Sequence, residues 1–61
     1  MRRFVKELAG YVIGMYPKDK VLVGNVNKYL DMVARGMITD LEASRLILID
    51  EVDARARMVK R

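Results

Sequence analysis

The amino-acid sequence predicts an all-α protein of three helices in an antiparallel arrangement, with a long C-terminal helix. Apolar residues recur at helical spacing in two segments before residue 36. A T-x-x-E pattern at Thr39 and Glu42 then marks the start of a third helix, and no Gly or Pro follows it. Because 61 residues bury a single small core, we expect one helical domain over residues 1–61.

The first predicted helix covers roughly residues 2–16. Its main apolar face follows the i, i+4, i+7, i+11 spacing and consists of Phe4, Leu8, Tyr11 and Met15, flanked by Val5, Val12 and Tyr16. Gly10 and Gly14 weaken a helix interior, and either the close approach of another helix or a tolerated looseness explains them. Pro17 ends the helix, since a proline pushes the preceding residue out of the α region.

The second predicted helix covers about residues 20–35, with Asp19 as its N-cap and Gly36 as its C-cap residue. Its apolar residues repeat the same spacing and are Leu22, Val26, Tyr29 and Val33. The VLV run beside Gly24 leaves open an extended conformation for residues 20–24.

The third predicted helix begins near Asp40 and continues almost to the C-terminus, over roughly 22 residues and about 33 Å. Residues 46–49, LILI, make it apolar on every side, and two short neighbours cannot surround it. We therefore expect a homodimer, or a higher oligomer, with the third helices central. The expected interface residues are Leu41, Leu46, Ile47, Leu48, Ile49 and Val52. A strand at residues 45–50 is the alternative, which the flanking helix signals disfavour.

The absence of Cys and His removes disulfides, transition-metal clusters and most catalytic constellations. Asp50 and Asp53 are one turn apart and suit a hard cation, but Arg57 and Lys60 favour a salt-bridge ladder with Asp53. We expect no enzyme activity, no cofactor and no metal. No apolar run is long enough for an integral membrane segment. The absence of Cys and the poor fit to a signal peptide favour a cytoplasmic location.

Twelve Lys and Arg against eight Asp and Glu give a net charge of +4, which favours polyanion partners such as DNA or RNA. The tip of the third helix should overhang the turn between the first two helices. That arrangement would gather the predicted phosphate-binding residues Lys18, Lys20, Arg55, Arg57, Lys60 and Arg61. Alternatively, cations late in a helix only complement its dipole. Arg2, Arg3 and Arg35 should collect at the opposite pole.

A helix-turn-helix is a less favoured alternative, because Glu42 and Arg45 occupy positions where that motif buries aliphatic residues. Residues 30–50 instead resemble the short helical hairpins of the SHOCT family, whose pattern is roughly L-x-x-L-x-x-x-G-x-I-T-x-x-E. The matching residues are Leu30, Gly36, Ile38, Thr39 and Glu42, while Val33 replaces the usual Leu. The resemblance implies a helical association segment.

Two functions follow from these patterns. The first is a small basic nucleic-acid-binding or regulatory protein that contacts phosphates at the poles of its bundle. The alternative is a protein-interaction or oligomerisation module, of the adaptor or inhibitor type, whose apolar third helix receives a helix of another protein.

Overall fold

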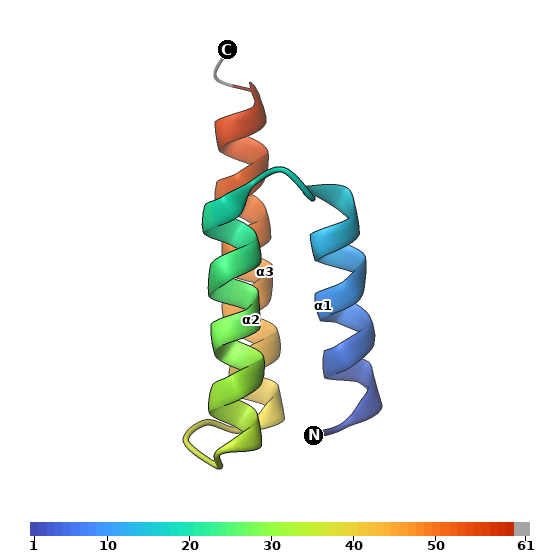
Figure 1. Ribbon diagram of the computed structural model, residues 1–61, viewed down its shortest axis with the longest axis vertical. Helices are drawn as coiled ribbons and strands as arrows, with labels where there is room; N and C mark the ends of the chain where they lie inside the picture. The colour runs from blue at the N-terminus through green and yellow to red at the C-terminus, as the bar shows by residue number, and fades with distance from the viewer. Residues whose placement is uncertain (60–61) are drawn as a thin grey trace.

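The computed structural model describes residues 1–59, which form three α-helices. These are α1 (Arg3–Met15), α2 (Lys20–Ala34) and α3 (Asp40–Val59). The helices run up, down and up, so α1 and α3 are parallel and α2 is antiparallel to both (Figure 1). The molecule is elongated, with extents of 38 × 17 × 16 Å. The predicted all-α, three-helix arrangement is confirmed, and α3 projects beyond the turn between α1 and α2 (Figure 1).

The first turn, which joins α1 to α2, is formed by the local interactions that the sequence predicts. Helix α1 ends at Met15, two residues before Pro17. The Oδ1 atom of Asp19 accepts a hydrogen bond of 3.1 Å from the backbone N–H of Leu22, which satisfies an orphan donor at the start of α2. Residues 20–24 are therefore helical, and the alternative of an extended segment is wrong.

The second turn, which joins α2 to α3, combines a glycine C-cap with a capping box. Gly36 has φ of +74°, a left-handed conformation that glycine adopts at little cost, and the N–H of Met37 donates to the carbonyl of Met32 at 2.9 Å. The N–H of Thr39 donates to Oε1 of Glu42 at 2.8 Å, and the N–H of Glu42 donates to Oγ1 of Thr39 at 3.1 Å. Both predicted caps are confirmed, and residues 45–50 are helical rather than a strand.

The core consists of nine buried apolar residues along the line where the three helices meet. They are Val5, Ala9, Val12, Tyr16, Leu22, Val26, Ala43, Ile47 and Ala54. Helix α2 points its predicted apolar face inward through Leu22 and Val26. In α1, however, the flanking residues enter the core, and the face predicted as the main apolar one is largely exposed.

Gly14 of α1 and Gly36 of the second turn provide the first test of this packing. A Cβ atom added at Gly14 would meet nothing within 4 Å, and the same holds at Gly36, whose φ is positive. Gly14→Ala should therefore stabilise the protein by about 0.5–1 kcal/mol. Gly36→Ala should destabilise it by about 1–2 kcal/mol, because alanine disfavours the left-handed region. Urea unfolding followed by circular dichroism would measure both, and a loss of stability in Gly14→Ala would contradict the open surface around α1.

Candidate functional site

An apolar surface runs along one side of α1 and the adjacent side of α3. Its exposed residues are Phe4, Tyr11 and Met15 from α1 and Leu41, Leu48 and Val52 from α3, with the half-buried Leu8 between them. We call this surface the α1–α3 face. Tyr11 is 69% exposed and Leu48 is 51% exposed, although the side chains of both are large and mostly apolar. Such a continuous patch marks an interaction surface more often than a solvated one.

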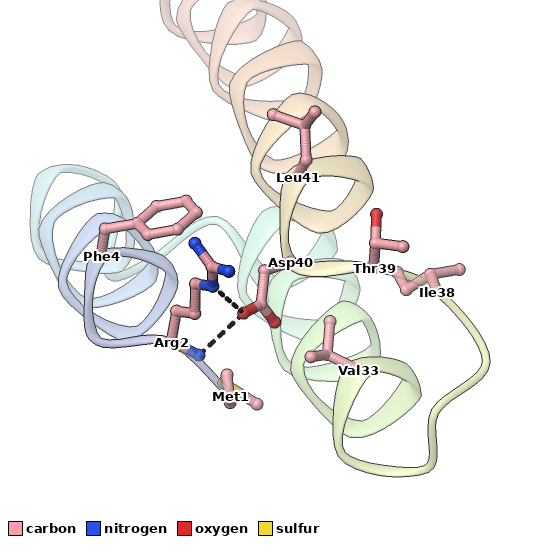
Figure 2. A pocket seen from close by; sticks show the side chains of 8 residues that line it. All are labelled: Met1, Arg2, Phe4, Val33, Ile38, Thr39, Asp40 and Leu41. Carbon is pink, nitrogen blue, oxygen red and sulfur yellow. Dashed lines mark hydrogen bonds and ion pairs between the residues drawn. The ribbon is translucent and has the colours of Figure 1, made fainter.

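One end of the α1–α3 face borders a hollow where the start of α1 meets the second turn, the end of α2 and the start of α3 (Figure 2). Phe4 and Leu41 line this hollow of about 580 Å³, and the ring of Phe4 points from α1 toward α3 (Figure 2). The backbone N–H of Arg2 donates to Oδ2 of Asp40 at 2.9 Å, and the Arg2 guanidinium lies 3.8 Å from the same oxygen. This contact holds the start of α1 beside the start of α3.

The remaining members of the face follow from helix geometry. Residues seven and eleven positions apart lie within about 20° of the same direction on an α-helix. Tyr11 and Met15 therefore continue the line of Phe4 along α1, and Leu48 and Val52 continue the line of Leu41 along α3. Since α1 and α3 are parallel, the two lines stay together along the molecule (Figure 1).

The predicted interface residues divide into three groups. Leu41, Leu48, Ile49 and Val52 are exposed, and Leu46 is half-buried. Ile47 is fully buried against the other two helices, so it belongs to the internal core and not to an interface. The expectation that residues 46–49 need neighbours on every side is therefore met inside the chain for Ile47. Leu48 and Ile49 remain uncovered.

At the opposite end, three of the predicted basic residues line a second hollow of about 500 Å³. Lys18 and Lys20, from the first turn, and Arg57, from α3, line it together with Asp19. The expected proximity of the tip of α3 to the first turn is thus observed for Arg57. Lys60 and Arg61 lie outside the described residues.

Several arginines that were expected to be available for phosphate binding form ion pairs with carboxylates instead. The guanidinium of Arg57 lies 2.9 Å from Oδ2 of Asp19, so the expected salt bridge from Arg57 to Asp53 is replaced by a contact with the first turn. Arg55 pairs with Glu51 at 2.9 Å, and at the other pole Arg35 pairs with Asp31. Ion pairing of this kind reduces the positive potential that a phosphate would meet.

A hydrogen-bonded triad of Tyr16, Glu51 and Arg55 joins α1 to α3, and the sequence did not single it out. The hydroxyl of Tyr16 donates to Oε2 of Glu51 at 2.7 Å, and Nη2 of Arg55 donates to both Glu51 oxygens at 2.9 Å. Glu51 is only 8% exposed. The sequence did contain a signal for the burial of Glu51. This residue lies four positions after Ile47 and three before Ala54, on the core side of α3. A carboxylate there requires partners.

The triad changes the acidity of its members. The hydrogen bond from Tyr16, and then that from Arg55, lowers the pKa of Glu51 below its ordinary value. The same hydrogen bond to Glu51, with burial second, raises the pKa of Tyr16. Glu51 is therefore an ionised structural link between helices at neutral pH.

The other acidic residues of α3 do not form a metal site within residues 1–59, where no group of three His, Cys, Asp or Glu side chains lies together. Oδ2 of Asp50 is buried and has no hydrogen-bond partner in this part of the chain. Burial, and secondarily the Asp50 carboxylate, raises the pKa of Tyr29. Asp50 thus faces the hydroxyl of an α2 residue and not a cluster of other carboxylates.

The chain matches none of the family models, curated proteins or solved structures with which it was compared. The resemblance of residues 30–50 to SHOCT hairpins therefore stays a prediction. Among residues 1–59, no helix is both long and apolar enough to span a bilayer.

The triad predicts a specific dependence of stability on pH. Because the folded pKa of Glu51 is depressed, its contribution is present above its ordinary pKa of 4.5 and is lost as the pH falls through the lower folded value. Tyr16→Phe, which removes only the hydroxyl, should lower the melting temperature at pH 7, and this difference from the parent should shrink below pH 4.5. Thermal melts of both proteins between pH 7 and pH 2.5 would measure it. A difference that is constant with pH would contradict the role of the Glu51 charge.

Proposed function

We propose that this protein is a non-catalytic helical protein-interaction module of the cytoplasm, and that the α1–α3 face is its binding surface. The single observation behind the proposal is the exposure of this face. Phe4, Tyr11 and Leu48 lie outside, while three of the nine buried apolar residues are alanine. A regulatory, adaptor or inhibitor role is compatible with such a surface.

The extent of the α1–α3 face supports this function. A large side chain that is about half exposed offers on the order of 100 Å² to a partner, so the six exposed residues together offer on the order of 600 Å². The largest apolar patch on a typical monomer is about 300–600 Å² and is often functional. The face therefore lies at the upper end of this range.

The charges around the hollow at the basic end support a second candidate function, nucleic-acid binding. Lys18 and Lys20 have no carboxylate partner among residues 1–59, and they lie beside Arg57. Lys60 and Arg61 follow α3 in the sequence. We place this function second because Asp19 and Glu51 already neutralise Arg57 and Arg55.

The first candidate predicts that cross-linking in cells depends on the face. The photoreactive residue p-benzoylphenylalanine would replace Tyr11 in one variant and Met37 in another. Met37 is also an exposed apolar residue but lies in the second turn. Illumination of cells that express each variant should give a defined covalent adduct from position 11 and none from position 37. The absence of an adduct from position 11, or equal adducts from both positions, would contradict the proposed function.

The second candidate predicts salt-sensitive binding to duplex DNA or RNA. Fluorescence anisotropy should show an affinity that falls steeply as the salt concentration rises, because counterions are released from the phosphates. The double variant Lys18→Glu, Lys20→Glu should weaken binding, whereas Lys28→Glu, on the exposed side of α2, should change it less. No binding even at low salt would remove this candidate.

A further inference from the structure

The residues of the α1–α3 face, together with Arg45 of α3, form two rows with identical spacing. Along each helix the intervals are four, three and four residues, which is the spacing of a coiled-coil seam. The α1 row is Phe4, Leu8, Tyr11 and Met15, and the α3 row is Leu41, Arg45, Leu48 and Val52. Each row offers side chains that can insert between the residues of a facing helix.

The two rows also lie at the same level along the molecule. Arg2 contacts Asp40 near one end, and Tyr16 contacts Glu51 near the other, so residues about 37 positions apart are neighbours. The rows are offset by 37 residues, since Phe4 corresponds to Leu41 and Met15 to Val52. The face is consequently a double seam, which a pair of helices can cover along its whole length.

The hydrophobic core of the single chain is small for a protein of this length. Three of the nine buried apolar residues are alanine, while Phe4 is 45% exposed. The accessible surface is 4526 Å², whereas a monomer of this mass typically exposes about 4000 Å². Chains of about 60 residues usually need an additional source of stability, and this one has no Cys for a disulfide.

The size of the α1–α3 face fits a specific occupant. Its exposed apolar area, on the order of 600 Å², accounts for most of the roughly 800 Å² that each partner contributes to a stable protein complex. In a two-fold dimer the same surface serves both partners, so no other protein is required to supply matching seams.

From these observations we propose that a second copy of this chain covers the α1–α3 face. The inference rests on the proposed function and names its partner. Helices α1 and α3 of the two copies form a four-helix layer, and α2 of each copy lies outside it. The interface thus includes α1 as well as α3, in contrast to a dimer held by the third helices alone.

Arg45 is the one charged residue in the two rows. Its position between Leu41 and Leu48 is one where a coiled-coil seam carries an apolar side chain, and a polar residue there lowers stability while restricting the register. Its long side chain can place the guanidinium at the rim of the interface while its methylene groups contact the partner. Arg45 is therefore a position at which the dimer can be strengthened.

Sedimentation equilibrium at protein concentrations from 1 μM to 1 mM tests whether a second copy covers the α1–α3 face. The parent chain should reach twice its mass of 7.0 kDa, with a melting temperature that rises with concentration. Tyr11→Asp and Leu48→Asp should each weaken dimerisation about 100-fold or more, because a carboxylate would be buried without a partner. Met37→Asp should leave it unchanged. Circular dichroism would establish that every variant keeps its helical content.

Arg45→Leu provides a test that misfolding cannot mimic. An apolar residue at this position should lower the dimer dissociation constant about tenfold or more. An unchanged or increased constant would overturn the packing of the two rows against a second copy.

The remaining outcomes separate this inference from the proposed function. If the parent protein stays at 7.0 kDa at all concentrations, the inference that a second copy covers the α1–α3 face is overturned. The photo-cross-link from position 11 then decides the proposed function, which stands if the adduct contains a different protein and fails if no adduct forms. A dimer that survives both Tyr11→Asp and Leu48→Asp would use another surface and would also overturn the inference.

Discussion

The parallel alignment of α1 with α3 is held at both ends by contacts to carboxylates of α3. At one end Asp40 accepts the backbone N–H of Arg2, and at the other Glu51 accepts the hydroxyl of Tyr16. These contacts join segments that are not consecutive, since α2 and two turns separate them in the chain. The orientation of α1 about its own axis, and hence the composition of the core and of the exposed face, depends on this alignment.

Small side chains in the core have a direct consequence for the surface. Ala9, Ala43 and Ala54 are buried where the helices meet, so the helices need less space between them than larger residues would require. The bulky residues Phe4 and Tyr11 then lie on the outer side of α1. The exposed apolar face and the small core thus both result from the way α1 packs against the other helices. Both favour association with another chain.

Charge has a mainly structural use in the described part of the chain. Asp19 caps α2 and also pairs with Arg57. The backbone N–H of Leu22, assisted by Arg57, lowers the pKa of that carboxyl. Glu51 similarly binds both a hydroxyl and a guanidinium. Within residues 1–59, less positive charge is therefore available at this pole than the number of Lys and Arg residues indicates, and Lys18 and Lys20 carry most of it.

The sequence by itself determined the helices, because their limits depend on local chemistry: Asp19, Gly36 and the Thr39 capping box act on backbone groups a few residues away. It also indicated an apolar surface on α3. Only the tertiary structure decided which side of α1 is buried, because two adjacent stripes of that helix are apolar at the same spacing and periodicity does not distinguish them. The choice between them, like the partnership of Tyr16 with Glu51, results from contacts between residues distant in sequence.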